Sequence, residues 1–350
     1  MSKSGLSCPL IDIRTVKAES ESMSKANLSG NLSKIKGKKV LIIGDIGVDE
    51  YVNGDVTKIS PEAPVPIVEA KEEYIRLGLA GNVAQNIKSL GGEALLLSVV
   101  GNDEAATSFR DLLKEAQVSP DFLFVDKSRP TTRKLRVLAG SHHVVRVDYE
   151  HRRFLEESVE NKILAKAKEV MTTIDAVILE DYAKGVISQR LVQELSQIAR
   201  ENDKLLMVDP HRLTPIEYYR GVELFKPNYD EAQILSGVIQ DDLHKKEDLI
   251  NEIIERLVKG YAFDKIVITR GKDGMTYYDG GGIKTVPTVS RPVFDVTGAG
   301  DSVIATLALA CAAGFSLEDA CTLANHAGGI VVSQMGCVPC KFTELEASLA

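Results

Sequence analysis

The chain of 350 residues contains no tryptophan, only five cysteines and no long apolar run. A membrane-spanning helix needs roughly 20 consecutive apolar residues, so we expect no membrane partner. Five cysteines cannot build a disulfide framework for a chain of this size. A basic excess is absent as well, because 42 Lys and Arg stand against 50 Asp and Glu, for a net charge of -8. This balance argues against nucleic acid as the main partner.

Several well-known site motifs are also absent. No G-x-x-x-x-G-K-[ST] sequence occurs, and the first apolar run is followed by "GDIGVD" where a dinucleotide-binding protein has G-x-G-x-x-G. P-loop NTPases and nicotinamide dehydrogenases are therefore disfavoured. The "CVPC" stretch, Cys337 to Cys340, has the spacing of a redox or zinc site, but no second ligand pair stands nearby. Two reduced thiols are the simpler interpretation, and a redox or metal role stays the alternative.

The first 36 residues are rich in Ser and Lys and show no sustained apolar periodicity. They lack the apolar segment of about 7–15 residues that a secretory signal requires. We therefore interpret residues 1–36 as a disordered extension of a cytoplasmic protein, and residues 37–350 as its folded domain.

The folded part alternates short apolar runs with amphipathic stretches. The runs are "KKVLIIGD", "EALLLSVVGND", "DAVILED", "KLLMVDP", "VELFKPN" and "DKIVITRG", and helical periodicity fills the segments between several of them. This alternation predicts a layered α/β domain with a mostly parallel central sheet.

Each apolar run ends on a polar side chain. In open α/β sheets, ligands bind outside the carboxyl ends of the strands, so these residues predict a shared polar site. A helix cap or turn former is the alternative for any single one of them. The residues are Asp45, Asp103, Asp181, Asp209, Asn228 and Thr269 with Arg270.

Two segments, at about residues 48–76 and 130–150, interrupt the alternation. The first is Pro-rich, and the second alternates polar and apolar residues about an "AGSH" turn, which is typical of a β-hairpin. We expect them to pair into a small antiparallel sheet, inserted as a lid. The cations gathered in the second suit a phosphate group, with a solvated strand face as the alternative. They are Arg129, Arg133, Lys134, Arg136 and Arg146.

The stretch "FDVTGAGDS" precedes an apolar helical pattern. A helix N-terminus offers unpaired N–H groups and partial positive charge, and glycines let a ligand approach them. Gly298, Ala299 and Gly300 therefore suit a phosphoryl oxyanion, and Asp301 beside them suits a general base. A glycine-rich turn with a helix-capping acid is the alternative on spacing alone.

These residues resemble the C-terminal signature of the ribokinase (PfkB) family of carbohydrate kinases. "GLAGNVAQNIKSLGG", "KPNYDE", "TRGKDG" and "ANHAGG" occur in the family's order. The resemblance implies a ribokinase-like layered α/β/α fold and ATP-dependent sugar phosphorylation. "ISPEAPVPIVEA" and "LEDYAKGVIS" look like the kinases of D-glycero-β-D-manno-heptose 7-phosphate, often fused to a nucleotidyltransferase; only the kinase step is expected of this chain.

The resemblance also implies roles for individual residues. It makes Asp301 the base for the sugar 1-hydroxyl, with Gly298, Ala299 and Gly300 as the anion hole. It implies Mg²⁺, held through water by Asn228 and Glu231, and an ATP site at Thr269, Gly271, Gly274 and Asn325. Near the sugar it implies Asp45, Asp49, Asn82 and Lys184, and our candidates for the 7-phosphate are Lys134, Arg136 and Arg146.

Two departures from the family pattern concern the substrate. Gly78 is followed by Leu79 where a second glycine is usual, and His211-Arg212 stands where these kinases commonly carry Lys-Gly. A kinase for another sugar, phosphosugar or nucleoside therefore stays open, as does a catalytically silent sugar sensor; a nicotinamide oxidoreductase is a distant third. Because lid sheets have exposed edges, we also expect a homodimer through the lid.

Overall fold

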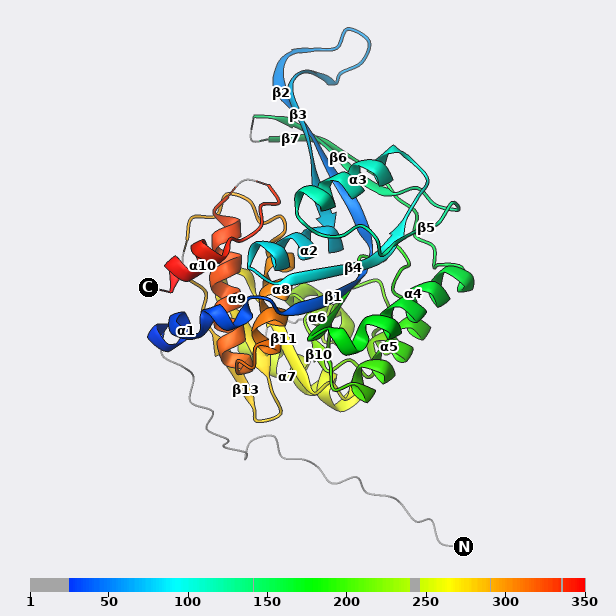
Figure 1. Ribbon diagram of the computed structural model, residues 1–350. Helices are drawn as coiled ribbons and strands as arrows, with labels where there is room; N and C mark the ends of the chain where they lie inside the picture. Colours follow the sequence, from blue (N-terminus) through cyan, green and yellow to red (C-terminus); the bar gives the residue numbers. More distant parts are fainter. Residues whose placement is uncertain (1–24, 141, 240–245, 290, 335, 350) are drawn as a thin grey trace, which may run out of the picture.

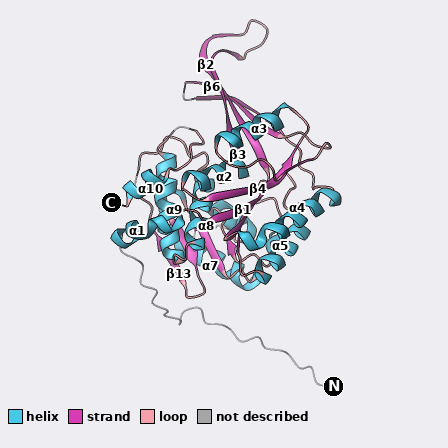
Figure 2. Cartoon of the chain, viewed as in Figure 1, coloured by secondary structure: helices cyan, strands magenta, loops and turns pink. Residues whose placement is uncertain are grey.

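The computed structural model describes residues 25–140, 142–239, 246–289, 291–334 and 336–349. Two sheets organise this part of the chain, a nine-stranded sheet flanked by helices and a four-stranded sheet above it (Figures 1 and 2). None of its helices is long and apolar enough to cross a membrane.

The large sheet has the order β13-β12-β11-β10-β9-β8-β1-β4-β5. Its strands from β11 to β5 are parallel, and β12 and β13 extend one edge antiparallel. All six predicted apolar runs lie in it, whereas β5, β12 and β13 were not predicted. The bounds are β1 Lys39–Gly44, β4 Glu93–Val100, β5 Leu123–Val125, β8 Ala176–Glu180, β9 Leu205–Asp209, β10 Leu224–Phe225, β11 Lys265–Thr269, β12 Met275–Tyr278 and β13 Ile283–Val286.

Alternation along the strands divides the core between the two faces of this sheet. Val40 and Ile42 of β1 pack into one hydrophobic cluster, and Leu41 and Ile43 into the other. The first cluster contains α1 Lys25–Asn31, α2 Ala80–Ser89, α3 Glu104–Glu115, α8 Ala299–Ala312, α9 Leu317–Val332 and α10 Phe342–Ser348. The second contains α4 Glu157–Val170, α5 Gln189–Glu201, α6 Tyr229–Ser236 and α7 Lys246–Tyr261. The predicted three-layer fold is confirmed.

The folded domain begins earlier than residue 37. Helix α1 and a 3₁₀ turn, Leu32–Ile35, precede β1, and Leu28, Leu32 and Ile35 are buried in the first cluster. The prediction of disorder was therefore wrong for residues 25–36, because three apolar side chains at helical spacing outweigh the polar composition around them. Residues 1–24 lie outside the described residues.

The four-stranded sheet is built from both predicted lid segments and projects from the body (Figure 1). Its strands are β2 Ile46–Ile59, β3 Pro66–Leu79, β6 Thr132–Ala139 and β7 His142–Tyr149, in the order β3-β2-β6-β7. It is mixed, not antiparallel as predicted, because β2 and β6 pair in parallel. Since β1 ends at Gly44 and β2 begins at Ile46, Asp45 is the single residue between these strands and the shortest of the chain's passages between the two sheets.

Candidate active site

The centre of the site is Asp301, in the first turn of α8. Its Oδ2 accepts a hydrogen bond of 2.7 Å from Nδ2 of Asn82, in the first turn of α2. Its Oδ1 accepts one of 2.7 Å from the hydroxyl of Tyr182, in the loop after β8. Burial raises the pKa of the Asp301 carboxyl, and the two donors partly offset that effect. A fixed carboxylate with a raised pKa is suited to accept a proton.

The residues before Asp301 present free amides. The N–H groups of Ala299 and Ser302 donate to the carbonyls of Val296 and Gly298. Within the described residues, the N–H groups of Gly300 and Asp301 have no acceptor in the protein. Together with the helix dipole, these two donors suit an anion. Of the predicted Gly298, Ala299 and Gly300, Ala299 has its N–H bonded to the carbonyl of Val296, and the N–H of Asp301 was not predicted as a donor.

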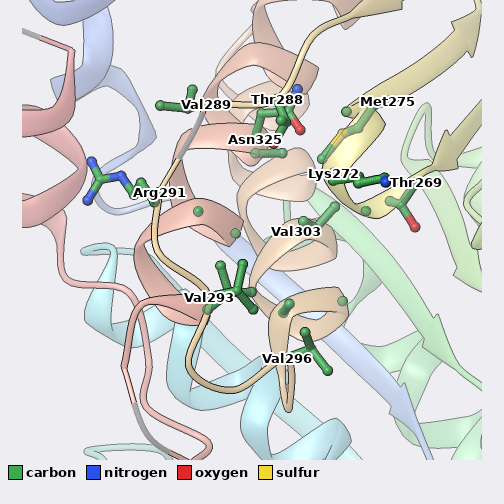
Figure 3. Close-up of a pocket in the computed structure, with 18 residues that line it drawn as sticks. Thr269, Lys272, Met275, Thr288, Val289, Arg291, Val293, Val296, Val303 and Asn325 are labelled. Atoms are coloured by element: carbon green, nitrogen blue, oxygen red, sulfur yellow. The ribbon is translucent and has the colours of Figure 1, made fainter.

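A cavity of about 360 Å³ opens beside this helix N-terminus (Figure 3). All four predicted nucleotide residues line it, and so do Ala299 and Gly300 of the anion site. Val293, Val296 and Val303 supply apolar wall, while Thr269 and Lys272 lie across from them (Figure 3). Asn325 donates through Nδ2 to the carbonyls of Val286 and Pro287 at 3.3 and 3.2 Å, which fixes one side of the cavity. An apolar cavity that ends at phosphate-binding amides suits a nucleotide.

Asn228 and Glu231 form a capping box at the start of α6. The Asn228 Oδ1 accepts from the Glu231 N–H, and the Glu231 Oε2 accepts from the Asn228 N–H, both at 2.9 Å. These two residues therefore do cap the helix, which was the alternative to a site role. The capping box uses only Oε2 of Glu231, so Oε1 is left for another partner. Glu231 has a pKa raised by burial.

Two ionisable side chains that were not predicted, Lys226 and Glu180, accompany the predicted strand-end residue Asp209. The Nζ of Lys226 contacts Oδ2 of Asp209 at 2.7 Å. Glu180 is fully buried, and neither of its carboxyl oxygens has a hydrogen-bond partner within the described residues. Burial raises the pKa of Asp209 to about 7 and that of Glu180 well above its usual value, with Asp209 and Asp301 adding repulsion to Glu180.

The residues present fit a hard cation held indirectly. Carboxylate and amide oxygens are the ligands that Mg²⁺ prefers, and the capping box leaves Oε1 of Glu231 for such a cation. Within the described ranges, no three His, Cys, Asp or Glu side chains gather closely enough to hold a metal ion. Asn228 and Glu231 would therefore hold Mg²⁺ through water, where it would neutralise phosphate charge.

Residues 38–344 match the sequence profile of the pfkB family carbohydrate kinases. The chain belongs to this family. It is 37% identical to the bifunctional protein HldE of Helicobacter hepaticus over 310 residues, which are 89% of this chain and 63% of that protein. It is 39% identical to the HldE of Caulobacter vibrioides over 316 residues, again 89% and 63% of the two chains. The chain thus spans less than two thirds of the length of these relatives.

Solved structures show the same fold at low identity. Arabidopsis thaliana ribokinase, solved with ribose and ATP, has a TM-score of 0.71 and 17% identity, covering 90% of this chain and 99% of that one. Escherichia coli phosphofructokinase-2 has a TM-score of 0.71 and 18% identity, covering 89% and 98%. The predicted family, the ribokinase-like fold and the class of carbohydrate kinase are all confirmed.

In this PfkB kinase, Asp45 is a scaffold residue and its carboxylate is already occupied. Its Oδ2 accepts from the N–H groups of Tyr182 and Lys184 at 3.0 and 2.9 Å, and its Oδ1 from that of Val186 at 3.0 Å. Burial and the neighbouring Asp181 raise its pKa to about 6. Asp45 therefore holds the loop after β8, and its predicted contact with the sugar lacks support from this geometry.

Asp49 and the predicted cations take up different positions around the lid. Asp49 is buried and accepts from Nη1 of Arg136 at 2.7 Å, while the exposed Arg146 pairs with Asp148 at 2.9 Å. The Lys184 Nζ contacts Glu150 at 2.5 Å. Within the described residues, Lys134 alone among the predicted phosphate and sugar cations lacks a carboxylate within ion-pair distance. Its pKa is lowered by burial, an effect to which Lys184 and Arg136 add.

The structure explains one residue that the sequence analysis noted, Leu79, and adds one that it did not predict, Tyr182. Leu79 has φ 56° and ψ -138°, a backbone conformation that favours glycine, which explains the family's usual second glycine there. Its side chain is buried in the protein. Tyr182 was not predicted as a site residue, although "LEDYAKGVIS" places it next to Asp181 at a strand end. A tyrosine alone gives no sign of which carboxylate it meets.

Proposed function

We propose that this protein transfers the γ-phosphate of ATP, with Mg²⁺, to the anomeric hydroxyl of a sugar phosphate. The substrate that we propose is D-glycero-D-manno-heptose 7-phosphate, which would become the 1,7-bisphosphate. One observation carries the reaction: Asp301, with both carboxylate oxygens held, directly follows Gly300, which lines the nucleotide cavity. The base and the phosphoryl donor are thereby neighbours.

Each group in this arrangement has a defined task. Asp301 removes the proton of the sugar hydroxyl, whose oxygen bonds to the γ-phosphorus as the bond to the ADP oxygen breaks. The amides of Gly300 and Asp301 stabilise negative charge on the transferred group. The lid covers the site and excludes water, which would otherwise compete as the acceptor.

Support for the sugar comes from two directions. The relatives named HldE share 37–39% of residues with this chain over 89% of its length. Lys134, on the lid strand β6, lies with its Nζ 5.9 Å from the ring centroid of Tyr182, and so carries its charge close to the base. A cation without a carboxylate partner at that place suits the remote phosphate of a sugar phosphate.

The decisive experiment is an ADP-release assay with a panel of sugars under Mg·ATP. We expect turnover with heptose 7-phosphate, and loss of about 10²–10⁴-fold in kcat for Asp301→Asn, with ATP binding retained in calorimetry. Turnover of fructose 1-phosphate or a nucleoside, with heptose 7-phosphate inert, would overturn the substrate. Near-normal activity of Asp301→Asn would overturn the base, and sugar binding without any transfer would favour a sensor.

We propose further that a second copy of the chain covers the outer face of the lid in a cytoplasmic homodimer. Val145, Val147 and Tyr149 of β7 and Ile75 of β3 are exposed. Ile75 and Val147 lie in one row across the sheet, because Glu50 and Leu135 are their successive cross-strand neighbours. Such a face has the same composition on each copy and can therefore pair with itself.

A further inference from the structure

Tyr182 is the one contact of the base that neither the sequence patterns nor the proposed chemistry uses. Its hydroxyl donates to Oδ1 of Asp301 at 2.7 Å, while Asn82 holds Oδ2 at the same distance. One hydrogen bond leaves a carboxylate free to rotate, and two from opposite sides fix its plane. Tyr182 as a residue is half-buried, and its hydroxyl is directed at the carboxylate of Asp301.

The loop that carries Tyr182 is held firmly in place. The backbone N–H groups of three alternate residues, Tyr182, Lys184 and Val186, donate to the carboxylate of Asp45. Ala183 between them has φ 54°, a conformation that costs a non-glycine residue energy and that the surrounding contacts maintain. The backbone of Tyr182 is therefore fixed relative to β1, from which Asp45 extends.

The ring of Tyr182 also contacts the lid. The Nζ of Lys134 lies 5.9 Å from its centroid, at the outer limit of a cation–π contact. Tyr182 thus lies between the base and the lid cation that we assign to the sugar phosphate.

We propose that Tyr182 is a positioning residue: its phenol stays protonated, fixes the reactive plane of Asp301 and stabilises the carboxylate that accepts the sugar proton. This inference rests on the proposed function, because it requires Asp301 to act as the base. The phenol donates a hydrogen bond throughout and transfers no proton. Burial and the nearby carboxylates raise the pKa of Tyr182 well above its usual value, which keeps this donor protonated.

The sign of the effect on pH dependence follows from this hydrogen bond. A donor to the carboxylate favours its charged form, so removal of the Tyr182 hydroxyl raises the pKa of Asp301. The activity of the variant should then need a higher pH. The other ionisable groups that face Asp301 stay in place, namely Lys226 after β10, Asp49 on β2, Asp209 on β9, Glu180 on β8 and Cys337 before α10.

The test is Tyr182→Phe, measured as ADP release with Mg·ATP and heptose 7-phosphate between pH 5 and 9. We expect kcat to fall by about 10- to 100-fold, as for a lost hydrogen bond to a charged group, and the acid limb of kcat/KM to move to higher pH. The KM for ATP should change little. Tyr219→Phe is the matched control, because Tyr219 donates at 2.7 Å to Asp181, a buried carboxyl other than the proposed base. It should lower the Tm and leave the acid limb unmoved.

An unmoved acid limb in folded Tyr182→Phe, or equal kinetic changes in the two variants, would overturn the proposal. Should Tyr182→Phe fail to fold, fluorotyrosine at position 182 keeps the shape and strengthens the donor; the acid limb must then move to lower pH, and no movement refutes the role. Asp301→Asn separates the two levels. If that variant retains turnover, the assignment of Asp301 as the base fails and the inference fails with it; if it is inactive and Tyr182→Phe is normal, only the inference fails.

Discussion

At the scale of single residues, the two glycines of the anion site have different requirements. Gly298 has φ 78°, and a Cβ there would lie 2.7 Å from Nδ2 of Asn82, the group that holds Asp301. At Gly300 the nearest neighbour of an added Cβ is Oδ2 of Asp209 at 3.9 Å, so the folded protein has room for it. Gly298 is required by the backbone conformation and the neighbouring Asn82, whereas Gly300 would be required only to leave space for the proposed ligand.

This difference predicts two kinds of loss. Gly298→Ala should lower the free energy of unfolding by about 1–3 kcal/mol and reduce turnover, because it strains the backbone and displaces Asn82. Gly300→Ala should keep the wild-type Tm yet lose about tenfold or more in kcat, because its methyl group enters the space before the amides. Thermal melts and ADP release check both, and a wild-type kcat for Gly300→Ala would contradict the anion hole.

The sequence predicted which residues belong to the site more easily than which residues they contact. The glycines and Asp301 were predicted from local spacing and the nucleotide residues from the family resemblance, and Gly300 lines one cavity together with the four nucleotide residues. The carboxylate hydrogen bonds of Asp45, Arg136 and Tyr182 join residues more than 80 positions apart along the chain, and no local pattern indicates such contacts. For this reason, the catalytic motif could be predicted while the scaffold role of Asp45 could not.

At the scale of elements, the lid sheet has two unlike faces. Asp49, Tyr51 and Arg136 lie toward the site, and the opposite face carries Ile75, Val145 and Val147. The parallel pairing of β2 with β6 was not predicted, because strand alternation gives the faces of a strand but not the direction of its neighbour.

The outer face predicts the effect of a charge on assembly. Val147→Glu should shift the protein from dimer to monomer, because a second copy would bury an unpaired carboxylate. Val125→Glu, at an exposed valine on β5 of the large sheet, is the control and should leave the mass unchanged. Light scattering coupled to size-exclusion chromatography measures both, and an unchanged dimer in Val147→Glu would rule out this face.

At the scale of the whole molecule, buried acids at the carboxyl edge of the sheet make stability depend on pH. The pKa of Asp45 rises from 3.8 to about 6 and that of Asp209 from 3.8 to about 7, both chiefly through burial. Between pH 4 and 7 the folded protein therefore binds more protons than the unfolded chain. Raised carboxyl pKa values stabilise the fold at low pH, and that contribution is lost as pH rises through them. His211, whose pKa is lowered by burial, opposes this effect. Asp103, Asp126, Glu150 and Asp295 have pKa values lowered by hydrogen bonds or ion pairs, so they oppose it at the acid end of the range.

We therefore expect the free energy of unfolding to be lower at pH 8 than at pH 5.5. The expected difference is about a few kcal/mol, because a pKa change of one unit between the folded and unfolded states corresponds to about 1.4 kcal/mol. Glu180→Gln keeps the shape of a buried carboxyl without its charge, so it should stabilise the protein at pH 8 and flatten the pH dependence. Urea unfolding at the two pH values checks this. A steeper slope in Glu180→Gln would contradict the assignment of Glu180 as a proton-binding group.

The single-residue passage at Asp45 is the shortest link between the lid and the large sheet, so it is a natural reference point for movement of the lid. At about 3.3 Å per residue, Asp49 lies about 13 Å along β2 from that point, and Ile59 about 45 Å. Any rotation of the lid about Asp45 displaces the far end of β2 more than three times as far as Asp49. Tyr182 donates its backbone N–H to Asp45, so it would move little in such a rotation. A spin label near Ile59 is thus the most sensitive reporter of a lid movement, and Tyr182 is the fixed point against which to measure it.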